Sequence, residues 1–155
     1  MPIGLIGIGY QNFFNCIKLN GITLPNTVQI LSRQAIAGCT SLRDVVIPDS
    51  VVSIGIAALE NINLNKVTIG RNVATIQGKA FNKWGHRISV LIVKGNNPPS
   101  LPSGGIFYSD EYLPYNIYVP DDSLDIYKSA WGRYASVIHP ISEYTGEIPS
   151  TDYTE

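Results

Sequence analysis

Charged residues, cysteines and histidines are scarce in this chain. Asp, Glu, Lys and Arg make up only 15% of its 155 residues, and there are two Cys and two His. The 11 basic and 12 acidic residues nearly cancel and form no basic run, so the electrostatic signature of a nucleic-acid-binding protein is missing. Neither His86 nor His139 shows ligand spacing to the two cysteines. We therefore expect no nucleic acid and no metal ion as a partner.

Motifs of catalysis and of membrane insertion are also missing. The chain has no G-x-S-x-G, no H-E-x-x-H and no acidic pair at catalytic spacing, so we expect no enzyme and no cofactor, with a triad assembled from distant residues left open. Gly7-Ile8-Gly9 resembles the start of a dinucleotide-binding turn, but Asn12 occupies the third glycine position.

The first seventeen residues carry no charge, yet Gly, Pro and Asn interrupt them and the first lysine is Lys18. We expect neither a signal peptide nor a membrane span there.

What the chain does have is a repeat. Residues 22–35, 45–58 and 67–80 superimpose with steps of 23 and 22 residues. Four apolar columns recur: Leu24, Ile47, Ile69; Val28, Val51, Val73; Leu31, Ile54, Ile76; and Ala35, Ala58, Ala80. The register extends to Met1-Pro2, Leu5, Ile8, Phe13 and Cys16 on one side and to Leu91, Val93 and residues 117–120 on the other. We count about five repeats, the last two degenerate, with a period in the leucine-rich-repeat range.

The extended triplet of each repeat alternates with period two, as a half-buried strand does. Its first and third residues should point inward, and Thr23, Val46 and Thr68 should point outward. A single repeat cannot bury its own apolar side, so stability must come from stacking on neighbours. We therefore predict that Ile54→Asp unfolds the body and that Thr68→Asp is tolerated.

The string C-x-x-L-x-x-V-x-I-P-x-S-V-x-x-I-G-x-x-A, read from Cys39 to Ala58, resembles the BspA-type leucine-rich repeats. These are common in surface proteins of gut and oral Bacteroidetes and of some protists. The stretch from Pro98 to Ile141 also resembles the ending that such arrays carry. The chain departs from the pattern at Gly70, where Pro is expected, and at Ile62, where Cys is expected. The resemblance implies a repeat fold that binds proteins or surfaces.

The predicted fold is therefore a leucine-rich-repeat solenoid of short stacked parallel strands with an irregular convex side. We divide it into repeats over residues 1–95, a degenerate last repeat and helical cap over 96–141, and an acidic tail over 142–155. Leu124, Tyr127, Trp131, Tyr134 and Ile138 are spaced 3, 4, 3 and 4, which predicts one amphipathic helix closing the end of the solenoid. Asp121, Asp122 and Asp125 fit the start of that helix better than a calcium site.

Cys16 and Cys39 fall in the same column, on adjacent repeats. We interpret them as buried thiols that act as small hydrophobes, because Ile62 fills the third position of that column. A disulfide between neighbouring strands remains geometrically open at this stage.

Candidate partner-binding residues come from the uneven distribution of tyrosine. Eight of the nine tyrosines lie in residues 108–155, and tyrosine is enriched at protein interfaces. Tyr108, Tyr112 and Tyr115 share one loop, where binding a partner and packing inside the chain remain equal alternatives. The second candidate surface is the outward strand row, since solenoids bind along such rows. That row comprises Thr23, Val46, Thr68 and, if the degenerate repeats stack, Ile92 and Tyr118.

The tail after Ile141 has four acids and no Lys or Arg, so the preceding body is +3 (11 minus 8) and the tail is −4. Its composition is typical of disorder, and we expect docking on a neighbouring subunit to hold it.

Two functional hypotheses follow. The first is a non-catalytic interaction or structural subunit of a larger assembly, such as a virion protein of a phage that infects Bacteroidetes hosts or a host-surface recognition module. The alternative is a bacterial cell-surface or secreted adhesion module.

Overall fold

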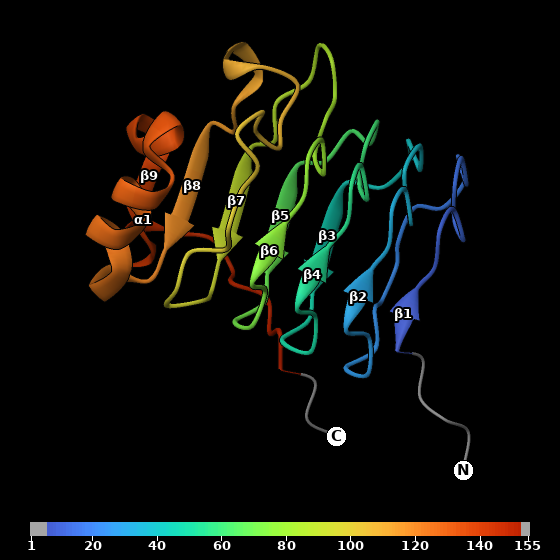
Figure 1. Cartoon of the computed structure of the whole chain (residues 1–155), viewed down its shortest axis with the longest axis horizontal. Coiled ribbons are helices and arrows are strands. Elements are labelled where there is room, and N and C mark those ends of the chain that lie inside the picture. Colours follow the sequence, from blue (N-terminus) through green and yellow to red (C-terminus); the bar gives the residue numbers. More distant parts are fainter. Residues whose placement is uncertain (1–5, 153–155) are drawn as a thin grey trace.

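Two parallel sheets run side by side through the computed structural model, which describes residues 6–152 (Figure 1). The first sheet has the order β1-β2-β4-β6 and consists of two-residue strands: β1 Gly7–Ile8, β2 Ile30–Leu31, β4 Ser53–Ile54 and β6 Thr75–Ile76. The second has the order β3-β5-β7-β8-β9, namely β3 Asp44–Ile47, β5 Lys66–Ile69, β7 Val90–Val93, β8 Asn116–Val119 and β9 Ile138–Pro140. We call the stretch from one strand to its neighbour in the same sheet a coil.

The register of both sheets follows the repeat. In the first sheet Ile8, Leu31, Ile54 and Ile76 pair in succession. In the second, the corresponding inward series is Val45, Val67, Leu91, Ile117 and Ile138. All twelve residues of the four predicted columns are buried, which confirms the inward assignment. Together the parallel sheets and the shared register are consistent with a repeat solenoid.

The core is one cluster of buried side chains that extends from Ile8 to Ile138. It includes residues of the predicted repeat region and of the predicted cap, so both share one interior. The assignments of Met1, Pro2 and Leu5 to the first repeat lie outside the described residues.

The first extended triplet, residues 22–24, is not a strand, contrary to the prediction. Leu24 is buried as expected, but Ile22 is only half-buried and Thr23 is exposed. Asn20-Gly21 before the triplet favours a turn there, which shortens the extended segment. β3 is therefore the first strand of the second sheet within the described part of the chain.

A third set of coil-to-coil hydrogen bonds, which the repeat pattern did not predict, runs along the turns that follow the first sheet. The Phe13 N–H donates to the Ala35 carbonyl at 2.9 Å, Ile36 N–H to Ala58 at 3.0 Å, and Leu59 N–H to Ala80 at 2.9 Å. The turns depend on left-handed backbone at one repeated position, occupied by Gln11, Gln34, Ala57 and Lys79. We call this series the turn ladder.

Gly55 and Gly70 stand where coils approach most closely. A Cβ atom on Gly55 would lie 2.7 Å from the Leu31 carbonyl oxygen, and one on Gly70 would lie 2.6 Å from that of Pro48. Such contacts are with rigid backbone, so a side chain at either position would push two coils apart. This close approach explains why glycine replaces the expected proline at position 70.

The C-terminal end differs from the predicted single helix. α1 spans Leu124–Ala130, short 3-10 turns span Asp121–Ser123 and Gly132–Val137, and Ile138 begins β9. Gly132 interrupts the helix, since glycine is a poor helix former. The predicted apolar stripe is nevertheless buried, apart from the half-buried Leu124. Its polar atoms bond to the preceding coil: the Tyr127 hydroxyl donates to the Gly95 carbonyl at 2.7 Å and the Trp131 indole N–H to the Pro99 carbonyl at 2.9 Å.

The three aspartates at this end serve no side-chain cap of α1. Asp121 instead accepts a hydrogen bond from the Ser142 N–H at 3.0 Å, and the hydrogen bonds from Ser142 lower the pKa of Asp121. Two more 3-10 turns are present: Asp110–Tyr112 lies in the loop before β8, and Ile141–Glu143 leads into the tail.

Both cysteines are free thiols. Cys39 is buried as predicted and donates to the Phe13 carbonyl at 3.0 Å, and burial raises the pKa of its thiol. Cys16 is only half-buried, so the prediction of a fully buried thiol holds for Cys39 alone. Among the described residues no three His, Cys, Asp or Glu side chains are grouped to hold a metal ion. Over the same residues we find no helix with the length and apolarity needed to span a membrane.

Candidate interaction surfaces

The acidic tail lies on the chain's own second sheet. In Figure 1 the red segment runs back from the C-terminal cap across the strands. The Asp49 N–H donates to the Thr151 carbonyl at 2.9 Å, and the Lys66 and Lys94 ammonium groups donate to the Glu147 and Pro149 carbonyls at 3.5 and 3.3 Å. The tail was expected to dock on a neighbouring subunit, but in the structure it docks on its own chain. Its backbone carbonyls make these hydrogen bonds, so no particular side chain is required in the tail.

This tail changes the predicted outward row. Val46, Thr68, Ile92, Tyr118 and His139 do pair in succession across the second sheet. Thr68, however, is 0% exposed, so the expectation that it lies open to a partner is wrong. Ile92 is also 0% exposed, Val46 and Tyr118 are half-buried, and of the predicted row only Thr23, which precedes the sheet, is exposed. The Tyr144 ring of the tail lies 5.0 Å from the Tyr118 ring, centroid to centroid.

Electrostatics at the end of the tail centre on Asp49. Partial burial of this carboxylate favours its neutral form, but its interactions with Arg71 and Thr151 together outweigh burial and lower the pKa of Asp49. Its Oδ1 accepts from the Arg71 N–H at 2.8 Å, and its Oδ2 contacts the guanidinium at 2.6 Å. Burial beneath the tail lowers the pKa of Lys94. The charges of the second sheet are therefore engaged inside the chain.

The tyrosine loop is partly exposed. Tyr108 and Tyr115 are exposed and Tyr112 is half-buried. The structure brings Tyr108 and Tyr112 together in an edge-to-face pair with centroids 5.7 Å apart. Tyr115 instead lies under the Arg87 guanidinium, 4.1 Å from the ring centroid. Packing inside the chain and exposure therefore coexist in this loop.

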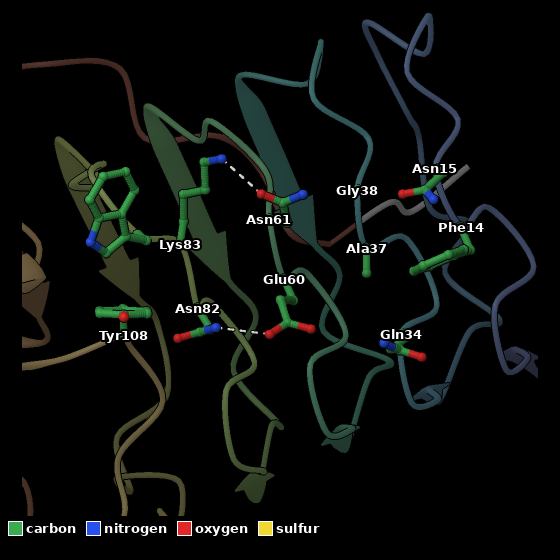
Figure 2. Close-up of a pocket in the computed structure, with 11 residues that line it drawn as sticks. Phe14, Asn15, Gln34, Ala37, Gly38, Glu60, Asn61, Asn82, Lys83 and Tyr108 are labelled. Carbon is green, nitrogen blue, oxygen red and sulfur yellow. Dashed lines mark hydrogen bonds between the residues drawn. The ribbon is translucent and has the colours of Figure 1, made fainter.

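A groove of about 350 Å³ follows the turn ladder, and Figure 2 shows residues that line it. We call it the turn groove. It is lined by Phe14, Asn15, Gln34, Ala37, Gly38, Glu60, Asn61, Asn82, Lys83, Trp84 and Tyr108. Trp84 is 69% exposed, more than any other large apolar side chain among the described residues. Sequence reasoning singled out Tyr108 but missed the groove, although the repeat register already placed Phe14, Ala37, Glu60 and Asn82 in one column.

The first sheet has exposed aliphatic side chains on and beside its strands. Its four strands contain no Asp, Glu, Lys or Arg. Four exposed aliphatic side chains lie on or beside these strands: Ile6, Ile30, Val52 and Ile56. We call this surface the aliphatic face. It was not predicted, because Ile30 and Val52 sit between inward positions and look like further core residues.

A family model for the BspA-type leucine-rich repeat region matches residues 1–97 with six copies. The chain belongs to the BspA-type leucine-rich-repeat family. This confirms the resemblance read from Cys39 to Ala58, while the resemblance of the C-terminal ending lies beyond the matched residues and stays a prediction. No curated protein matches the chain. Leucine-rich repeats generally mediate protein interactions, so BspA-type repeats indicate an interaction or surface role for this chain.

Proposed function

We propose that this BspA-type protein is a non-catalytic interaction module, acting as a structural subunit of a larger assembly or in surface recognition. The observation that carries the proposal is the aliphatic face. Exposed apolar surface with few charges marks sites where another protein docks. The tail already lies on the outer face of the second sheet, so of the two sheets the first is the one whose outer face remains available to a partner.

The non-catalytic part of the proposal is supported by the absence of recognised catalytic motifs from the sequence. A substrate turnover that disappears on substitution of one surface residue would contradict it.

The location of the protein is a narrower proposal. A virion component is consistent with an assembly subunit. The tail does not argue for a neighbouring subunit, however, because residues 142–152 bond to the chain itself. Family membership favours the alternative, a bacterial cell-surface or secreted adhesion module. The genes beside the coding sequence distinguish these proposals: capsid and tail genes support the first, and a surface-protein locus supports the second.

Site-specific photo-crosslinking in the source cells or particles tests the interaction surface. A photoreactive residue in place of Ile30, on the aliphatic face, should capture one defined protein or a second copy of this chain. The matched control is Ile126, an exposed isoleucine on α1. Capture of the same partner from both positions, or from neither, would contradict the proposal.

A further inference from the structure

The turn groove offers hydrogen-bonding groups that are neutral or already paired. The Asn82 amide donates to a Glu60 carboxylate oxygen at 2.8 Å, and the Lys83 ammonium donates to the Asn61 side-chain oxygen at 2.7 Å (Figure 2). One negative and one positive charge line the groove, and each is bound to an amide. The groove therefore does not select a strongly charged ligand such as a phosphate or an acidic peptide.

These pairs leave both donors and acceptors free to bind a ligand. Asn82 keeps its side-chain oxygen and Asn61 keeps its NH₂ group, while Glu60 has a second oxygen and Lys83 has further N–H donors. The four side chains lie on adjacent coils and are held in place by their mutual bonds. Such a row of alternating donors and acceptors matches a ligand whose own groups both donate and accept, as hydroxyl groups do.

An extended peptide would not find main-chain partners here. The backbone groups along the groove are used by coil-to-coil bonds: the Asn15 N–H donates to Ala37 at 2.8 Å, Gly38 to Glu60 at 2.8 Å, and Asn61 to Asn82 at 2.8 Å. These three N–H groups are therefore not free for strand addition, which relies on free main-chain groups. The groove also lacks the helical-spaced row of apolar positions that an amphipathic helix would need, because its aromatic side chains come from separate coils.

Three exposed aromatic rings line the groove, and Phe14, at 40%, is the least exposed of them. Trp84 is 69% exposed and Tyr108 is 51% exposed. Trp84 directly follows Lys83 in the chain, and Tyr108 lies at the same end of the groove as Asn82 and Lys83 (Figure 2). Exposed rings with an apolar surface and a polar edge stack on flat apolar faces of ligands while the ligand's polar groups bond elsewhere. Sugar rings have this combination of an apolar C–H face and hydroxyl groups at the rim.

We propose that the turn groove binds a neutral oligosaccharide chain. Trp84 and Tyr108 stack on its sugar rings, and Glu60, Asn61, Asn82 and Lys83 bond its hydroxyl groups. The ligand lies across the coils, because the polar positions recur from coil to coil. This site is separate from the aliphatic face, so either proposal can fail without the other.

The full-length chain should be tested on a printed array of neutral and acidic glycans, followed by titration with the strongest neutral ligand. Trp84 and Trp131 are the only tryptophans and Trp131 is buried, so a change in tryptophan fluorescence on titration reports mainly on Trp84. We expect saturable binding, and a loss of roughly tenfold or more in affinity for Trp84→Ala. Trp84→Phe should restore part of the affinity, because it keeps a ring.

The matched control is Tyr115→Ala, which removes an exposed ring outside the groove and should leave affinity unchanged. Circular dichroism should show every variant folded, since each replaced side chain is exposed. Several results would overturn the proposal: no glycan bound, a preference for acidic glycans alone, equal affinity for Trp84→Ala and the original chain, or capture of a protein segment in the groove instead.

Discussion

Ile54→Asp is expected to abolish the cooperative folding of the whole body. Ile54 is 0% exposed, and it lies between Leu31 and Ile76 on the neighbouring strands. Loss of the aliphatic side chain alone costs about 2–5 kcal/mol, and an unpaired buried carboxylate adds several more, against a typical total stability of about 5–15 kcal/mol. Because coils are stable only through their neighbours, a defect in a central coil removes two interfaces at once.

Circular dichroism with urea titration measures this effect. Val52→Asp is the matched control, since it places the same charge two residues away at an exposed position and should change stability by no more than about 0.5 kcal/mol. Ile54→Leu should cost less than about 1.5 kcal/mol, because it preserves volume. A cooperative transition retained by Ile54→Asp, or lost by Val52→Asp, would refute the inward assignment.

Thr68→Asp is expected to release the tail while the coils stay folded. Thr68 is fully buried, and its hydroxyl has no hydrogen-bond partner within the described residues. The tail bonds to Lys66 at the start of the same strand, β5, and to Lys94 just after the neighbouring strand β7. A carboxylate at position 68 must be hydrated to stay charged. Displacing the tail to hydrate it costs less free energy than unfolding the sheet. This replaces the tolerance predicted from the repeat pattern.

Limited proteolysis with mass spectrometry should show cleavage between residues 144 and 152 in Thr68→Asp long before cleavage in the coils. The free energy of unfolding should fall by about 0.5–3 kcal/mol. Thr23→Asp is the control, because Thr23 holds the same repeat position but is exposed. Equal resistance of the tail in both variants would show that the tail does not depend on this face.

The core was predictable because side-chain volume repeats with the coil. Each residue of the four columns sees the same neighbours one coil away, so an apolar residue recurs there and the period is visible without a structure. The apolar stripe of the C-terminal cap was readable for a related reason, as its side chains cover the last coil. The residue at which the helix ends could not be predicted, because the pairing of Ile138 with Ile117 in the sheet competes with helix formation. That pairing depends on residues distant in sequence.

The interaction surfaces were harder to predict, for physical reasons. The tail docks through backbone carbonyls of Glu147, Pro149 and Thr151, which any sequence possesses. The turn ladder places Gln34, Ala57 and Lys79 in left-handed backbone, where glycine would have signalled the turn. Trp84 lies in a degenerate stretch, so no equivalent aromatic in earlier repeats drew attention to it.

Stacking of successive coils in register is the claim on which every surface depends, and disulfide trapping tests it most directly. The Ser53 and Thr75 hydroxyl oxygens lie 3.2 Å apart on paired strands β4 and β6. Ser53→Cys with Thr75→Cys should therefore form an intramolecular disulfide under mild oxidation of the native chain, because paired neighbouring strands meet the geometry of that bond. Ser53→Cys with Gln77→Cys, two residues out of register, should not. Peptide mapping that found the first bond only in urea, or both bonds equally in the native chain, would contradict the stacked arrangement.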